Sequence, residues 1–162
     1  MAPPDGRTRH YGSFYGLAPT DRTDDAVDAH PQYGTAALAR IVETMRSAGL
    51  IVQLEQTGNI DDISPAVSLG VHRLVQESLT NVLRHAGDSP RAKVVVTRRE
   101  IDVVVEVVDN GSGELRSRTK KIVGTGNGLL GMRERVAVLG GTVEVGPHAD
   151  GSWKVRAELP LD

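Results

Sequence analysis

The spacing of apolar residues along the chain predicts three helices. In three stretches the apolar side chains recur with the helical period of about 3.6, and glycine, which commonly ends a helix, follows each stretch. The stretches are residues 35–48 before Gly49, residues 65–86 before Gly87, and residues 129–139 before Gly140 and Gly141. The second stretch opens with Ser64 and Pro65, an N-cap residue followed by a first-turn proline, and predicts a long helix.

Five further segments predict β-strands. They are residues 51–55, two valine-rich strands within residues 93–108, residues 143–145 and residues 153–159. The valine-rich stretch breaks only at residues 99 and 100, which indicates a tightly joined antiparallel pair. In its second strand Val103, Val105 and Val107 share one face, and Asp109 continues that face. The alternation therefore predicts that the carboxylate of Asp109 points inward.

These elements predict an α+β fold, with a mixed, mainly antiparallel sheet of about five strands packed against three helices. Consecutive strands are expected to pair antiparallel. Residues 1–34 are rich in proline and glycine and follow neither period, so a flexible leader is expected there. The folded domain should then comprise residues 35–162.

Composition excludes several classes of function. With 19 Lys and Arg against 21 Asp and Glu, the 162-residue chain has a formal charge of -2 and no basic block, so nucleic acid is not an expected partner. The absence of cysteine excludes disulfides and thiolate metal sites. The sequence has no signal peptide and no apolar run near the roughly 20 residues of a membrane helix. A cytoplasmic protein, or the cytosolic portion of a membrane receptor, is expected.

A polar stripe runs along the second predicted helix, because Glu77, Asn81 and His85 are spaced by four. One alternative is that they are ordinary surface residues. A functional interpretation gives Asn81 as an oxygen ligand of Mg²⁺, which prefers hard oxygen donors. Glu77 would then orient or deprotonate a water or polarise an acceptor group. Arg84 and His85 would lie within reach of phosphate oxygens.

Two glycine-containing segments follow. Asp109 is succeeded by Gly111 and Gly113, which allow the backbone to approach a flat ligand, and an inward carboxylate suits the exocyclic amine of adenine. An ordinary Asp-Asn-Gly hairpin turn is the alternative. However, residues 114–123 are mostly polar or basic and resume no strand, which is more typical of a mobile lid.

The second glycine segment opens the third predicted helix. Its glycines would present unpaired N–H groups and the positive helix end to a phosphate, and they are Gly124, Gly126, Gly128 and Gly131. The alternative is a flexible loop with capping glycines. The segment matches neither the P-loop nor the dinucleotide-binding fingerprint, so phosphates would be held differently.

Taken in order, these motifs resemble a known family. The helix with Glu77 and Asn81 resembles the N-box, and residues 109–113 and 124–132 resemble the two glycine boxes, of the Bergerat-fold ATPases. Within that superfamily, Gly-Leu-Leu-Gly-Met-Arg-Glu-Arg at 128–135 and the closing Leu-Pro at 159–160 are similar to the catalytic domain of two-component histidine kinases of the nitrate-sensor and DesK-like subgroup.

The resemblance implies a two-layer α/β sandwich that binds ATP and Mg²⁺ beneath a lid of about residues 114–127. It implies that Asn81 coordinates Mg²⁺, that Glu77 is the catalytic acidic residue of the N-box and that Asp109 binds the adenine amine. Arg84 and His85 match the basic neighbours of the phosphates, although lysine is commoner at position 84. The remaining residues assigned to ATP are Gly111, Gly113, Thr125, Gly126, Asn127, Gly128 and Leu129.

One part of a complete kinase of this subgroup is missing from the sequence. None of the five histidines lies in a dimerising helical hairpin and precedes an acidic residue, so no autophosphorylation on this chain is expected. The expected partner is a histidine-containing dimerisation domain, in a larger receptor or in a separate protein, followed by a response regulator. The chain itself is expected to be a monomer. An anti-sigma-factor serine kinase and a non-catalytic, ATP-responsive interaction module are alternatives.

Overall fold

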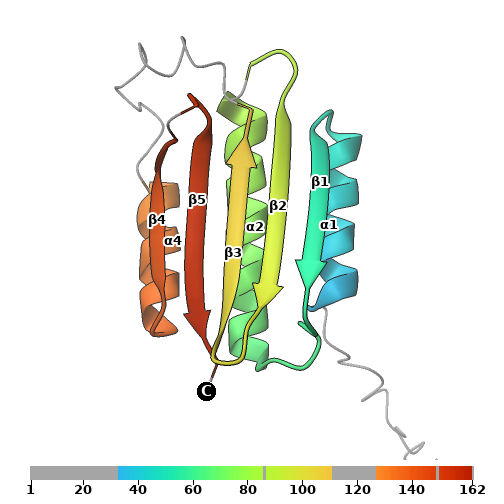
Figure 1. Ribbon diagram of the computed structural model, residues 1–162. Helices are drawn as coiled ribbons and strands as arrows, with labels where there is room; N and C mark the ends of the chain where they lie inside the picture. The colour runs from blue at the N-terminus through green and yellow to red at the C-terminus, as the bar shows by residue number, and fades with distance from the viewer. Residues whose placement is uncertain (1–32, 86, 111–126, 149, 162) are drawn as a thin grey trace, which may run out of the picture. The chain divides into compact units, whose positions relative to one another are not determined.

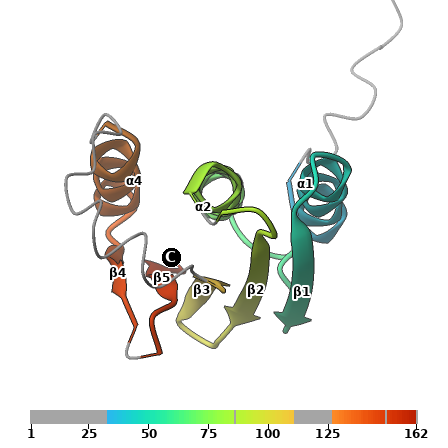
Figure 2. The ribbon, with the colours of Figure 1, turned by 90° about the horizontal axis from the view of Figure 1, so that it is seen from above.

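In the computed structural model, a five-stranded sheet is covered on one face by three helices (Figure 1, Figure 2). The structure describes residues 33–85, 87–110, 127–148 and 150–161. The helices are α1 (Thr35–Ser47), α2 (Pro65–His85) and α4 (Asn127–Val138). The strands are β1 (Ile51–Thr57), β2 (Arg91–Arg98), β3 (Asp102–Asp109), β4 (Thr142–Pro147) and β5 (Trp153–Pro160). The predicted fold class, a mixed sheet packed against three helices, is confirmed, whereas the predicted leader lies almost entirely outside the described residues.

The order of strands in the sheet is β1-β2-β3-β5-β4. The pairs β2–β3, β3–β5 and β4–β5 are antiparallel, and β1–β2 is parallel. The expectation that consecutive strands pair antiparallel was therefore wrong for β1 and β2. The long helix α2 connects these two strands and returns the chain to the same edge, so that both run in one direction. It was also wrong for β3 and β4, because β5 lies between them.

The helix boundaries follow the signals in the sequence. The Val67 N–H donates to Ser64 Oγ at 3.4 Å, so Ser64 caps α2 as predicted. Gly49 follows α1 with a φ of 99°, and Gly140 follows α4 with a φ of 72°. This left-handed conformation favours glycine and turns the chain out of each helix.

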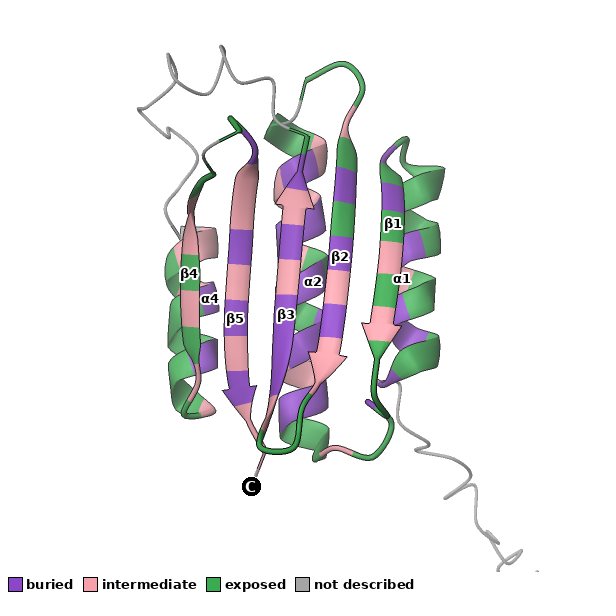
Figure 3. Cartoon of the chain, viewed as in Figure 1, coloured by how far each residue is buried: buried purple, intermediate pink, exposed green. Residues whose placement is uncertain are grey.

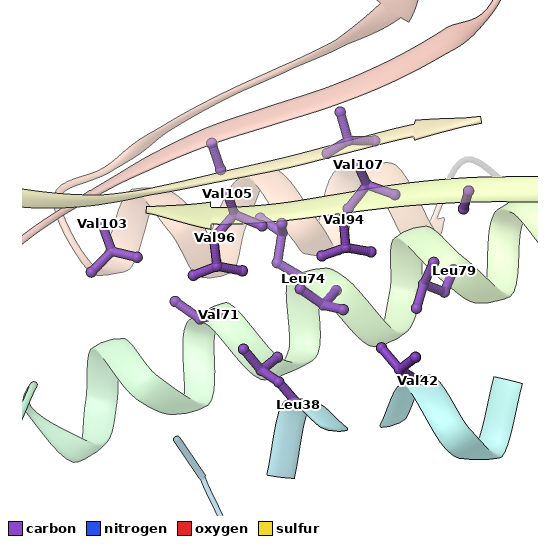
Figure 4. Packing of buried hydrophobic residues seen from close by; sticks show 14 of the residues in the cluster. Leu38, Val42, Val71, Leu74, Leu79, Val94, Val96, Val103, Val105 and Val107 are labelled. Atoms are coloured by element: carbon purple, nitrogen blue, oxygen red, sulfur yellow. The ribbon is translucent and has the colours of Figure 1, made fainter. Parts of the chain in front are cut away.

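The core lies between the helices and the inner face of the sheet, and Figure 4 shows how it is packed. It joins Leu38 and Val42 of α1 and Val71, Leu74 and Leu79 of α2 to Val94, Val96, Val103, Val105 and Val107 of the sheet. Burial alternates along β3 from Val105 to Asp109, as the sequence predicts, whereas Val103, Val104 and Val105 are all buried (Figure 3). Each buried valine contributes roughly 1.5–3 kcal/mol to stability. Because a slip of one residue would expose all of them, this packing fixes the register of β3.

The other face of the sheet is charged. Glu106 on β3 lies 2.8 Å from Lys154 Nζ and 3.2 Å from Arg156 Nε, both on β5. The hydrogen bond from Lys154 is the main reason that the pKa of Glu106 is lowered. Lys93 and Glu55 pair at 2.9 Å between β2 and β1. Ion pairs thus make this face compatible with water, and the described helices all pack on the opposite face.

The longest described helix, α2, has 21 residues and is amphipathic. Its buried side faces the sheet, while Arg73, Gln76 and Arg84 are exposed. None of the helices in the described part of the chain combines the length and the apolar content needed to cross a membrane.

Candidate functional site

The predicted polar stripe lies along the flank of α2. Glu77 and Asn81 are half-buried, whereas Arg84 and His85 in the last turn are exposed. The side chains of the stripe therefore begin at the border of the apolar face and continue toward the carboxyl end of the helix. This end lies at the same edge of the sheet as the start of β2, because only a short loop connects them (Figure 1).

Glu77 is close to the start of α4. A Cβ built on Gly128 would lie 2.6 Å from Glu77 Oε1, which is closer than real Cβ atoms approach. The carboxylate thus occupies space that a side chain at position 128 would need. Two motifs that are about 50 residues apart in sequence are therefore in contact, as their resemblance to the N-box and the second glycine box leads one to expect. Leu129, the next residue, is half-buried.

Asp109 ends β3 on its inner face. It is 2% exposed, and the predicted inward orientation is confirmed. The backbone N–H of Trp153, the first residue of β5, donates to Asp109 Oδ1 at 3.0 Å. A buried carboxylate needs hydrogen-bond donors of this kind. In the pairing of β3 with β2, Asp109 lies opposite Ala92. The next described element after β3 is the helix α4 and not a strand. The described residues therefore do not form the simple hairpin that was the alternative for this motif.

Asn110 has a role that the sequence interpretation missed. Its Oδ1 accepts a hydrogen bond from the Arg91 N–H at 2.9 Å, and its Nδ2 donates to the Ser89 carbonyl at 3.2 Å. Its own N–H donates to the Arg91 carbonyl at 3.1 Å. Asn110 therefore ties the end of β3 to the loop before β2. The signal was present, since asparagine side chains often bond backbone groups at the ends of strands, but the sequence does not identify the partners.

Several predicted site residues cannot be placed. Gly111, Gly113, Thr125 and Gly126 lie outside the described residues, as does nearly all of the predicted lid, residues 114–127. Asn127 is the first residue of α4. Within the described ranges, no group of three or more His, Cys, Asp or Glu side chains is arranged to hold a metal ion.

A separate cavity of about 430 Å³ lies between α1 and α2. Tyr33, Arg40, His72 and Arg73 contribute to its lining, and none of the predicted site residues does. His72 is 6% exposed, and its burial lowers its pKa despite a 2.9 Å hydrogen-bond contact of Nδ1 with the Ser68 carbonyl. This cavity is distinct from the candidate site.

The candidate site thus combines side chains of two elements, β3 and α2, with the start of α4. Asp109 provides a buried carboxylate oxygen, which suits an amine donor. Asn81 provides a neutral amide oxygen on α2, and Glu77 provides a carboxylate at the start of α4. The start of a helix also attracts negative charge.

A family model describes the greater part of this fold. The model for histidine kinase-, DNA gyrase B- and HSP90-like ATPases matches residues 66–162, which include all but the first residue of α2, the candidate site and strands β2 to β5. The chain belongs to this ATPase family. The resemblance inferred from the three motifs is therefore confirmed.

Curated relatives of this ATPase-family chain are sensor histidine kinases. It is 32% identical over 130 residues to sensor histidine kinase YxjM of Bacillus subtilis, covering 78% of this chain and 30% of that protein. It is 36% identical over 91 residues to the oxygen sensor histidine kinase NreB of Staphylococcus carnosus, covering 56% and 25%. It is 31% identical over 112 residues to the signal transduction histidine-protein kinase/phosphatase DegS of B. subtilis, covering 68% and 29%. These kinases are of the nitrate-sensor and DesK-like type, and the chain spans less than a third of the length of each.

Solved structures share the fold. The catalytic domain of histidine kinase ThkA superposes with a TM-score of 0.57 at 20% identity, covering 80% of this chain and 93% of that one. The blue-light activated histidine kinase EL346 of Erythrobacter litoralis superposes with a TM-score of 0.63 at 22% identity, covering 80% and 42%. The likeness confirms the fold predicted from the sequence.

Proposed function

We propose that this chain binds ATP with Mg²⁺ and donates the γ-phosphoryl group to a histidine of a partner domain in two-component signal transduction. The observation that supports this most directly is the contact between Glu77 and the backbone of Gly128. It brings a carboxylate of α2 to the start of α4, where a helix end favours phosphate. Membership of the ATPase family and similarity to sensor histidine kinases support the interpretation of this contact as part of an ATP site.

In this proposal different residues bind different parts of ATP and its Mg²⁺. Asp109 accepts a hydrogen bond from the exocyclic amine of adenine, and Asn81 contributes an oxygen ligand to Mg²⁺. Arg84 and His85 lie in the last turn of α2, where they would approach phosphate oxygens. The remaining residues assigned to ATP by resemblance are Gly111, Gly113, Thr125, Gly126, Asn127, Gly128 and Leu129. When bound, Mg²⁺ would neutralise negative charge on the phosphates.

The proposed transfer needs a proton acceptor close to the incoming histidine. The lone pair of a neutral imidazole nitrogen forms the new N–P bond, while the bond between the γ-phosphorus and the bridging oxygen breaks and its electrons leave with ADP. Glu77 would accept the proton that the second imidazole nitrogen loses. Glu77 is half-buried, which limits its contact with water. Positioning and electrostatics would supply most of the rate.

We further propose that the acceptor histidine belongs to a dimerisation domain, in the same longer polypeptide or in a separate one, and that a response regulator receives the phosphoryl group next. Of the histidines with described side chains, His72 is buried and thus a poor acceptor. We also propose that the protein is cytoplasmic and that it is a monomer when it lacks such a domain.

Labelling with γ-³²P ATP and Mg²⁺ tests the proposal. The chain is incubated with candidate dimerisation domains, and the product is treated with acid and with base. We expect an acid-labile, base-stable label on the partner, and we expect Glu77→Gln to bind ATP but to transfer little. Acid-stable phosphoserine on a small partner would instead establish the serine-kinase alternative. ATP binding without label on any partner would favour the non-catalytic module.

A further inference from the structure

Asn110 connects β3 to the loop before β2 at the edge of the sheet that carries the candidate site. Its side chain bonds both the Arg91 N–H and the Ser89 carbonyl, so it bridges from β3 to the loop before β2. On the other side of this loop, the Ile51 N–H at the start of β1 donates to the Pro90 carbonyl at 3.0 Å. The loop is therefore fixed between β1 and β3.

This loop directly follows the end of α2, which carries Arg84 and His85. Gly87 has a φ of 79°, a left-handed conformation that sharply redirects the chain after the helix. Because Ser89 comes only four residues after His85, a displaced loop would release the last turn of α2. The bonds of Asn110 thus restrain the segment from which two proposed phosphate neighbours project.

Asn110 also follows Asp109 directly. The carboxylate of Asp109 is held on one side by the Trp153 N–H of β5. On the other side, the hydrogen bonds between Asn110 and Arg91 continue the pairing of β3 with β2 beyond Asp109. Asp109 is the last residue of β3, where pairing tends to fray, and these bonds extend the pairing by one residue. The direction of its carboxylate therefore depends on its neighbour.

We propose that Asn110 is a positioning residue for nucleotide binding, which keeps Asp109 directed at the base and the end of α2 directed at the phosphates. The inference rests on the proposed function, because it assumes that the site binds ATP. Asn110 is exposed, and both polar atoms of its side chain are engaged by backbone groups. It therefore acts through Asp109 and the loop.

Asn110→Ala tests the inference by removing both side-chain bonds while leaving the backbone bonds. Each net hydrogen bond corresponds to a factor of about two to ten in an equilibrium constant, so affinity for ATP should fall about tenfold. The preference for ATP over GTP should fall as well, because GTP lacks the amine that Asp109 would recognise. Titrations with both nucleotides, followed by the fluorescence of Trp153, measure these effects in the full chain.

Asn59 offers a matched control. It is also exposed, and its Oδ1 accepts a hydrogen bond from the Asp61 N–H at 3.0 Å, but it follows the opposite end of β1. Asn59→Ala should bind ATP like the unaltered protein. Asn110→Asp keeps an acceptor for the Arg91 N–H and loses the donor to Ser89. Measured at about 0.3 M salt to screen the added charge, it should fall between Asn110→Ala and the unaltered protein.

The outcomes separate the two proposals. Unchanged affinity in Asn110→Ala overturns the positioning role while the proposed function stands. An equal loss for ATP and GTP, accompanied by a lower melting temperature, also overturns it, since that pattern describes a stability effect alone. If the unaltered protein and Asn59→Ala both fail to bind ATP, the proposed function fails and the inference fails with it. If Asn110→Ala does not fold, Asn110→Asp provides the same comparison.

Discussion

Replacing Gly128 with alanine should slow phosphoryl transfer without unfolding the protein. The new Cβ would lie 2.6 Å from Glu77 Oε1, so this oxygen must move by about 0.8 Å to reach ordinary contact at 3.4 Å. The obstructing atom is at the end of a flexible side chain, so Glu77 can turn away at little cost in stability. Alanine also gains about 0.5–1 kcal/mol in a helix relative to glycine. We therefore expect an unchanged or slightly higher melting temperature.

The rate should respond much more strongly than the stability. A catalytic group that is misplaced by about 1 Å can lose a factor of about 100 in rate, and general acid–base catalysis contributes about 100- to 10,000-fold in total. We expect transfer to slow by about 10- to 100-fold in Gly128→Ala, with a much smaller change in ATP affinity. Gly131→Ala is the matched control, because its Cβ would lie 3.1 Å from Nη1 of the exposed Arg135, which can move aside.

Single-turnover transfer of labelled phosphate measures the rate, titration of Trp153 fluorescence measures the affinity, and thermal unfolding measures the stability. The double variant Gly128→Ala with Glu77→Gln decides the mechanism, since two changes that act on one group should not add. If Gly128→Ala transferred at the rate of the unaltered protein, or slowed the Glu77→Gln variant by a further large factor, the proposed position of the Glu77 carboxylate would be refuted.

Further predictions concern the ligand and the pH dependence. Asn81→Ala should abolish the Mg²⁺-dependent part of nucleotide binding, and a titration with and without Mg²⁺ measures it. Asp109→Asn keeps an acceptor for the Trp153 N–H but turns a carboxylate into an amide. It should weaken the binding of ATP at least tenfold and have little effect on the binding of GTP. Equal losses of affinity for the two nucleotides would exclude a role of Asp109 in base recognition. Hydrogen bonds from Ser152, with a smaller contribution from His148, lower the pKa of Asp150 to about 2. A carboxyl whose pKa is lower in the folded state than in the unfolded state stabilises the fold at a pH above its unfolded-state pKa. This stabilisation is lost as the pH falls through the folded-state pKa. Between pH about 4 and about 2, the unaltered protein should therefore lose more unfolding free energy than Asp150→Asn, as measured by urea unfolding.

The sequence predicted the elements well because their patterns are strong. The alternation of valines in β3 placed Asp109 on the buried face, and its 2% exposure agrees. Strand direction was harder, because an apolar pattern is the same read in either direction. The 21-residue helix between β1 and β2 was nevertheless a usable signal, since parallel strands need a long crossover connection whereas antiparallel strands can be joined by a tight turn. The insertion of β5 between β3 and β4 left no local signal.

Contacts within the candidate site were less predictable than its members. Spacing by four placed Glu77 and Asn81 on one flank of α2, which is a local property of the helix. The approach of Glu77 to Gly128, and the bonds from Asn110 to the loop before β2, depend on how distant segments pack. Such contacts arise from tertiary structure, so residue types alone indicate only which side chains are able to make them. The catalytic and ligand-binding roles stay predictions.

The turn between β4 and β5 connects the pH dependence to the site. Ser152 donates to the Asp150 carboxylate through both its N–H and its hydroxyl, and the next residue, Trp153, donates its N–H to Asp109. Protonation of Asp150 would weaken the bonds that fix Ser152 and, one residue later, the donor that holds Asp109 in place. As the pH falls, this support of Asp109 should therefore be lost only near pH 2, where Asp150 protonates, whereas Asp150→Asn should show weaker ATP binding already at neutral pH. If Asp150→Asn bound ATP normally at neutral pH, the turn would be shown to stabilise the hairpin without influencing Asp109.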